Sequence, residues 1–251
     1  MITDLSVNEY QTIQRKNNLL FPKSIRGCII GKSGCGKTNL LMNLLLGEFD
    51  SFDFLDYDHL YIYGKSLHQP EYKLLNTCYR FNNSKNDTFK CFKNKINPIR
   101  QLKNPEVYIE MSDDLNSIPD PVDFNKKDKN IVIFDDVMLE NQNNIESYYT
   151  RGRHNNIDCF YISQNYFKLP RQTIRENSNL FFIFKQDQMN VNKIYNDHCN
   201  DITLDDFKIL CRISWIEPFG FITIDNSKSV YQGKYRKGFN EFFFPKDIKD
   251  L

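Results

Sequence analysis

Residues 26–38 read Arg26-Gly27-Cys28-Ile29-Ile30-Gly31-Lys32-Ser33-Gly34-Cys35-Gly36-Lys37-Thr38, and an apolar helical pattern, Asn39-Leu40-Leu41-Met42-Asn43-Leu44-Leu45-Leu46, follows them. The spacing satisfies G-x-x-x-x-G-K-[ST] through Gly31, Gly36, Lys37 and Thr38, between a predicted strand and a predicted helix. Because glycine reaches backbone angles that are closed to other residues, such a loop can turn successive N–H groups toward phosphate oxygens. The stretch therefore predicts a P-loop that binds a nucleoside triphosphate.

The predicted phosphate site consists of consecutive residues, Gly31, Lys32, Ser33, Gly34, Cys35, Gly36, Lys37, Thr38 and Asn39. Lys37 is expected to bridge the β- and γ-phosphates, and the Thr38 hydroxyl to ligate Mg²⁺. The helix that begins near Lys37 adds the positive end of its dipole. ATP and Mg²⁺ are therefore the expected cofactors.

A second signal is the run Asn130-Ile131-Val132-Ile133-Phe134-Asp135-Asp136, which is apolar until its two carboxylates. Continuous apolar runs of this length are typical of buried parallel strands. About a hundred residues after a P-loop, the run is similar to a Walker B segment. Asp135 would then support Mg²⁺, and Asp136 would activate the attacking water. Aspartate is one methylene shorter than glutamate, so Glu140 is a second candidate for the base.

A further strand is predicted over residues 157–162, and it runs into Ser163-Gln164. A polar residue at the end of the strand that follows Walker B can report the γ-phosphate or position the water. Gln164 is therefore a candidate sensor residue. The alternative is a plain amide at the end of a strand.

Two arginines, Arg151 and Arg153, follow a predicted polar helix over residues 140–149. An arginine at such an edge can enter a neighbouring subunit's site and neutralise charge on the departing phosphoryl group. The alternative is that these cations stabilise the helix C-terminus. Arg175 is a further finger candidate, and together with Lys168 and Arg171 it forms a candidate DNA contact.

Length and composition set limits on the class of protein. The 251 residues fit one α/β domain with additions, and 33 basic and 32 acidic residues give a net charge of +1. The net charge therefore gives no indication of nucleic-acid binding, and only local basic patches could bind a nucleic acid. The seven cysteines form no C-x-x-C pair, as expected for a reducing compartment. With no signal peptide or apolar span in view, we expect a soluble, intracellular protein.

The chain divides into three predicted parts: an N-terminal arm over residues 1–24, a P-loop ATPase core over 25–200 with an insertion at about 79–127, and a C-terminal extension over 201–251 packed on the core. The arm contacts either a neighbouring subunit or its own core. Within the insertion, residues 79–103 are basic with interleaved phenylalanines, which suits either a nucleic-acid surface or a solvated segment. In the extension we expect a helix over 204–210 and a hairpin over 213–224 that turns at residues 217–220.

With these motifs in place, the chain resembles the FtsK-HerA superfamily of DNA-pumping ATPases, and within it the genome-packaging ATPases of large DNA viruses, virophages and polinton-like elements. The resemblance covers residues 26–184. It is carried by the P-loop, Tyr61-Ile62-Tyr63 with Gln69-Pro70-Glu71-Tyr72, Ile133-Phe134-Asp135-Asp136, Thr150-Arg151-Gly152-Arg153-His154-Asn155, and Ser163-Gln164-Asn165-Tyr166-Phe167 before Pro170.

The resemblance implies an α/β fold, a P-loop NTPase of the ASCE/RecA-like type with a mostly parallel central sheet flanked by helices. It also implies that the sensor strand lies between the P-loop and Walker B strands. The implied function is an ATP-driven double-stranded DNA translocase that packages a viral genome into a preformed capsid. The implied partners are duplex DNA, read without sequence preference, other copies in a hexameric or pentameric ring, and a capsid or portal vertex. The resemblance further implies that aspartate is suitable at the position of Asp136, as in the viral branch of the superfamily. The implied location is the host-cell cytoplasm or a virus factory, or association with the virion.

Two other functions are compatible with the same motifs. One is a P-loop ATPase switch that regulates a partner without translocating DNA, and duplex DNA would not stimulate its turnover. The other is a structural nucleotide-binding component of a capsid portal, in which Asp136→Asn would change nothing. The sequence favours the translocase.

Overall fold

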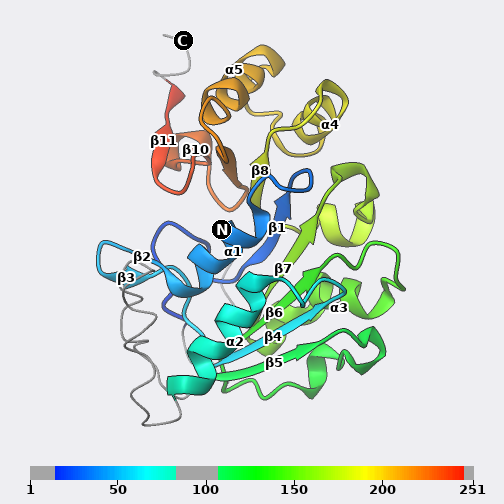
Figure 1. Cartoon of the computed structure of the whole chain (residues 1–251). Helices are drawn as coiled ribbons and strands as arrows, with labels where there is room; N and C mark the ends of the chain where they lie inside the picture. Colours follow the sequence, from blue (N-terminus) through cyan, green and yellow to red (C-terminus); the bar gives the residue numbers. More distant parts are fainter. Residues whose placement is uncertain (1–14, 83–106, 246–251) are drawn as a thin grey trace, which may run out of the picture.

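The computed structural model describes residues 15–82 and 107–245, and a large twisted sheet runs through them (Figure 1). Within these residues the sheet has the strand order β11-β10-β9-β8-β1-β7-β6-β4-β5. The strands are β1 (Arg26–Ile30), β4 (His59–Gly64), β5 (Tyr108–Ser112), β6 (Asn130–Asp135), β7 (Ile157–Ser163), β8 (Leu180–Phe184), β9 (Phe221–Asp225), β10 (Tyr235–Lys237) and β11 (Glu241–Phe243). A separate pair consists of β2 (Glu48–Phe49) and β3 (Phe52–Asp53).

The parallel part of the sheet confirms the predicted strand arrangement. The P-loop strand β1 pairs in parallel with β7 on one side and β8 on the other, and β6 pairs with β7 and β4. The strand that ends at Gln164 therefore lies between the P-loop and Walker B strands. Since all these strands are parallel, their carboxyl ends meet at one edge of the sheet, where crevices for ligands form.

Helices cover both faces of the sheet, and the strands are accordingly apolar on both sides. Helices α1 (Lys37–Leu46) and α2 (Pro70–Asn82) share one apolar core with alternate strand residues such as Ile29, Ile133 and Phe182. The opposite core contains Cys28, Phe134 and Phe181, and is covered by α3 (Asn143–Arg151), α4 (Gln188–His198) and α5 (Leu204–Ser214). No helix among the described residues is both long and apolar enough to cross a bilayer.

The C-terminal residues extend the sheet. Strand β9 pairs antiparallel with β8 and with β10, and β10 pairs with β11. The expected helix over 204–210 is present, but the expected hairpin over 213–224 is wrong, because Ile213 and Ser214 still belong to α5. Phe207, Leu210, Cys211 and Ser214 are buried at spacings of three and four, so this apolar stretch follows the helical period.

The region around the expected insertion also differs from a simple added segment. Residues 108–112 form β5, the edge strand that pairs in parallel with β4. Helix α2 continues to Asn82, and residues 83–106, which hold most of the basic stretch, lie outside the described residues.

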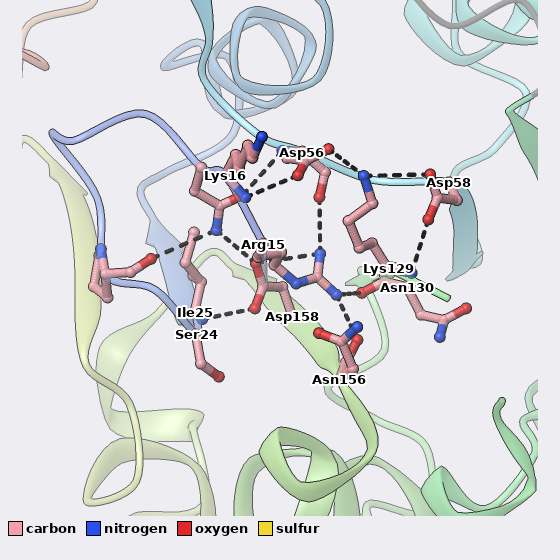
Figure 2. Close-up of polar contacts among 12 residues, drawn as sticks. Arg15, Lys16, Ser24, Ile25, Asp56, Asp58, Lys129, Asn130, Asn156 and Asp158 are labelled. Atoms are coloured by element: carbon pink, nitrogen blue, oxygen red, sulfur yellow. Dashed lines mark hydrogen bonds and ion pairs between the residues drawn. The ribbon is translucent and has the colours of Figure 1, made fainter. Parts of the chain in front are cut away.

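The described part of the arm, residues 15–24, lies against its own core. Leu20 and Phe21 are buried, and Arg15 reaches the amino-terminal edge of the sheet (Figure 2). Its guanidinium donates to the backbone carbonyls of Asp56 and Asn130 at 3.0 and 2.7 Å and lies 3.5 Å from the Asp158 carboxylate. The Arg15 and Asp158 side chains are only 3% and 1% exposed, so the pair fastens the arm inside the fold.

Replacing Arg15 with alanine is expected to destabilise the protein by about 3–5 kcal/mol, because it leaves the buried Asp158 carboxylate without its cation. Lys16→Ala, at an exposed neighbouring side chain, should stay within about 0.5 kcal/mol of wild type. Urea unfolding measures both. Adding Asp158→Asn to the Arg15→Ala chain should recover part of the loss.

The stability that the protein loses on Arg15→Ala should depend on pH. Burial raises the pKa of the Asp158 carboxyl and the charge of Arg15 opposes that rise, so removing Arg15 raises the pKa further. The folded variant then holds a proton that its unfolded chain releases, and its stability falls as pH rises through the raised pKa. The gap to wild type should be wider at neutral than at acidic pH. Equal losses for Arg15→Ala and Lys16→Ala would contradict the role of Arg15 as an anchor, and a gap to wild type that does not change with pH would contradict the raised pKa of Asp158.

Candidate active site

The loop between β1 and α1 has the backbone geometry of a phosphate cradle. Gly34 and Gly36 have φ angles of +75° and +101°, in the left-handed region that other residues avoid. A Cβ on Gly31 would lie 2.4 Å from the Cys35 Sγ and 2.7 Å from the Phe184 Cβ, so this position has no room for a side chain. Helix α1 begins at Lys37, directly after the loop, and its free N–H groups face the same space.

Lys37 is held by its own loop. Its Nζ donates to the carbonyl oxygens of Gly31 and Lys32 at 2.7 and 2.9 Å. No carboxylate of the described residues forms an ion pair with it. An ammonium group satisfied only by neutral carbonyls gains a stronger, charge-assisted partner when a phosphate oxygen arrives. Lys37 is therefore free to act on a phosphate.

The two aspartates at the end of β6 differ in their surroundings. Asp135 is buried and accepts a hydrogen bond of 2.6 Å from the Tyr72 hydroxyl. Burial raises the pKa of the Asp135 carboxyl, and the Tyr72 hydrogen bond opposes the rise. Asp136 is exposed, has a left-handed φ of +58°, and accepts a hydrogen bond of 3.0 Å from the Ser66 hydroxyl. The strained backbone turns this carboxylate out of the sheet.

A cavity of about 340 Å³ joins these groups at the carboxyl edge of the sheet. Predicted residues from three strand ends line it together, which is the arrangement that the motif order implied. Its wall is formed by Ser33, Gly34, Gly36, Lys37, Thr38, Asn39, Ser66, Gln69, Glu71, Asp135, Asp136, Met138, Ile162, Gln164 and Phe219. Gly31, Lys32 and Cys35 belong to the loop but not to this wall, and the alternative base Glu140 lies outside it, 3.9 Å from Lys65.

Several residues near the cavity had no role in the sequence prediction, and four of them contact the predicted groups or come from outside the predicted core. Ser66 and Tyr72 bond the two aspartates, Gln69 accepts a hydrogen bond of 3.3 Å from the Thr38 hydroxyl, and Phe219 comes from the C-terminal extension. Gln69 and Tyr72 occur in a stretch that carries the family resemblance, which was their only signal. For Ser66 and Phe219 nothing in the spacing indicated a place at the site.

The arginines lie away from this cavity. Arg151 is 54% exposed and forms an ion pair of 3.0 Å with Asp120, while Arg153 is exposed and donates to His154 at 3.3 Å. Arg175 is different, because it is buried, pairs with Asp197 at 3.1 Å and stacks on Tyr166. A buried and paired guanidinium cannot reach into a neighbouring copy, so Arg175 is a packing residue and not a finger candidate.

The cavity fits the cofactors that the sequence predicts. Its volume is within the range of small-molecule sites, about 300–1,000 Å³. The left-handed glycines and the start of α1 suit a phosphate chain, and no carboxylate in residues 15–82 or 107–245 pairs with Lys37. The Thr38 hydroxyl and the Asp135 carboxylate both line the wall and are oxygen ligands of the kind that Mg²⁺ prefers.

Comparisons with known proteins identify the fold. No protein-family model and no curated protein matches the sequence. Among solved structures, the genome packaging NTPase B204 from Sulfolobus turreted icosahedral virus 2 in complex with AMP is similar over 88% of this chain and 98% of its own, with a TM-score of 0.54 and 10% identity. Its complex with ATP-gammaS matches over 86% and 97%, with a TM-score of 0.51 and 10% identity.

The DNA-packaging ATPase B204 from Sulfolobus turreted icosahedral virus is also similar, over 86% of this chain and 97% of its own, with a TM-score of 0.52 and 13% identity. At these identities the likeness concerns the fold. The predicted α/β P-loop NTPase fold is confirmed, and it is the fold of these two viral genome-packaging ATPases.

Lys37→Ala should weaken binding of a slowly hydrolysed ATP analogue roughly tenfold to a hundredfold, since it removes one charged hydrogen-bond donor to phosphate. Lys32→Ala is the matched control, because that exposed lysine lies in the same loop but outside the cavity wall. Calorimetric titration measures both affinities. A similar loss in both variants would mean that the loop attracts phosphate only through its general positive charge.

Proposed function

We propose that this chain is an ATP-driven double-stranded DNA translocase that packages a viral genome and acts as an oligomeric ring. The observation that carries the proposal is the shared cavity of Lys37, Asp135, Asp136 and Gln164, which contains groups to bind and cleave a triphosphate but, among the residues that the structure describes, no arginine. The fold shared with two viral packaging NTPases supports the same conclusion.

Each side chain of the cavity has a proposed role. The loop amides and Lys37 hold the β- and γ-phosphates of ATP, as in other P-loop NTPases. Mg²⁺, held by the Thr38 hydroxyl and the Asp135 carboxylate, would neutralise charge on the phosphate oxygens. Asp136, exposed on the wall and oriented by Ser66, accepts the proton of the attacking water. The Gln164 amide reports whether the γ-phosphate is present.

The missing cation is proposed to come from a second copy. Helix α3 starts after the carboxyl end of β6 and leads to the amino end of β7, so Arg151 and Arg153 lie toward the edge opposite their own cavity. Both are exposed, and neither is bound to a buried partner. An arginine finger that neutralises the phosphoryl group contributes roughly 10³–10⁵ in rate. Ring assembly would therefore control hydrolysis.

Duplex DNA is proposed to contact the exposed cations of the segment after Gln164. Lys168 follows the sensor residue closely, and Arg171 is 63% exposed and pairs with Glu176 at 3.3 Å on the surface. Because these two cations follow Gln164 in the chain, they connect the residue that reports the γ-phosphate to the surface that would contact DNA. Contacts to phosphate position a protein on DNA without reading sequence, which suits a protein that moves along the whole genome.

Long duplex DNA should stimulate ATP turnover, and the stimulation should fall steeply with salt whatever the DNA sequence. The combined variant Lys168→Ala and Arg171→Ala should bind DNA more weakly and lower the slope of log affinity against log salt by about 2, since each phosphate contact contributes about 0.9. Lys73→Ala with Lys127→Ala, which removes two exposed lysines elsewhere, is the matched control. Turnover that ignores DNA would indicate the switch, and a flat salt response would contradict the translocase.

A further inference from the structure

The turn between α5 and β9 brings an aromatic ring to the wall of the cavity. This turn contains Pro218, Phe219 and Gly220, and it belongs to the C-terminal extension. Among the described residues that line the cavity, Phe219 is the one aromatic side chain. Its ring contacts the P-loop, because a Cβ on Gly36 would lie 3.2 Å from the Phe219 Cδ1.

Neither packing nor backbone preference explains an aromatic residue here. Phe219 is 67% exposed, so most of its ring is not used in the core. Its φ of +62° lies in the left-handed region, which is unfavourable for a bulky side chain. Strained, exposed residues of this kind are concentrated at ligand sites. Phe219 is therefore an exposed aromatic ring that lies against the predicted phosphate-binding loop.

The turn is firmly held. The Gly220 amide donates to the Glu217 carbonyl at 3.0 Å, which closes the turn. A Cβ on Gly220 would lie 2.3 Å from the carbonyl oxygen of Ser214, so the turn packs directly on the end of α5. The Trp215 indole, which follows that helix end, donates to the Ile183 carbonyl of β8 at 2.9 Å. Hydrogen bonds and packing on both sides of the turn therefore fix the position of the Phe219 ring.

The strand order fixes which end of a nucleotide could meet this ring. Asp135 ends β6, and Gln164 and Ser66 follow β7 and β4; these three strands all lie on one side of the P-loop strand. Phe219 precedes β9, which lies on the other side of the P-loop strand, beyond β8. A triphosphate whose γ-phosphate faces the aspartates must therefore extend its nucleoside away from them, toward Phe219.

We propose that Phe219 is the platform on which the nucleobase of the bound nucleotide stacks. The inference rests on the proposed function, because it requires that the cavity holds a nucleoside triphosphate. A ring face attracts any base, since every base has a π-face, and it favours the larger purine ring. The C-terminal extension thus supplies the nucleoside end of the site, while the core supplies the phosphate end.

The test compares a ligand with a base and a ligand without one. Phe219→Ala should weaken binding of Mg²⁺-ATPγS roughly tenfold to a hundredfold, and should leave the affinity for inorganic tripolyphosphate within about twofold of wild type. Phe219→Trp should retain the ATPγS affinity, and ATPγS but not tripolyphosphate should quench its added fluorescence. Ile216→Ala is the matched control, because Ile216 is 76% exposed nearby but does not line the cavity.

The outcomes separate the proposed nucleotide site from the proposed stacking of a base on Phe219. A wild-type chain that binds neither ligand would overturn the proposed nucleotide site and this inference with it. A wild-type chain that binds both ligands, together with a Phe219→Ala chain that binds ATPγS as tightly as wild type, would overturn base stacking alone. Equal losses for both ligands would assign Phe219 to loop structure, which also overturns it. Thermal unfolding of each variant confirms that the fold is intact.

Discussion

The parallel pairing of β4, β6, β7, β1 and β8 is the constraint on which the rest of this structure depends. It brings residues from distant parts of the chain to one edge of the sheet, since every one of these strands ends there. The phosphate loop, the two aspartates and the candidate sensor need no long side chains to meet, because hydrogen bonds between strands already set their spacing. The cavity is thus a consequence of strand order.

The opposite edge of the sheet has a complementary role. There Arg15 is surrounded by backbone carbonyls at the starts of β6 and β7, and its charge faces Asp158 on β7 (Figure 2). The pair joins the arm to the same strands whose far ends carry Asp135 and Gln164. Arg151 ends α3 near this edge, and Arg153 lies in the short 3-10 helix that follows. One edge of the sheet therefore holds the groups that we propose bind the nucleotide, and the other fixes the arm and carries the exposed arginines.

The sequence predicted the elements whose signals are local. The P-loop, the apolar run into Asp135 and Asp136, and the strand before Gln164 each have a short pattern that physical chemistry explains directly. Other features depend on contacts distant in sequence. Ile213 belongs to α5 and not to a hairpin. The helical spacing of the buried residues around it favours the helix, and β9 pairs with the distant strand β8 instead of with the residues just before it. Arg175 matched a finger by position, but Asp197 and Tyr166 bury it. No local pattern connects Phe219 to Gly36, almost two hundred residues earlier.

The central claim is that one copy holds the triphosphate and a second copy supplies the charge needed to cleave it. Mixing two inactive chains tests this directly: Lys37→Ala, which retains both candidate arginines, and Arg151→Ala with Arg153→Ala, which retains the cavity. In a closed ring of randomly mixed copies, about a quarter of the interfaces combine an intact cavity with an intact arginine, so turnover should recover to about that fraction of wild type. Arg212→Ala, at an exposed arginine of α5, controls for loss of charge. An equimolar mixture that stays inactive, or an arginine-deficient chain that turns over at the wild-type rate, would contradict the account.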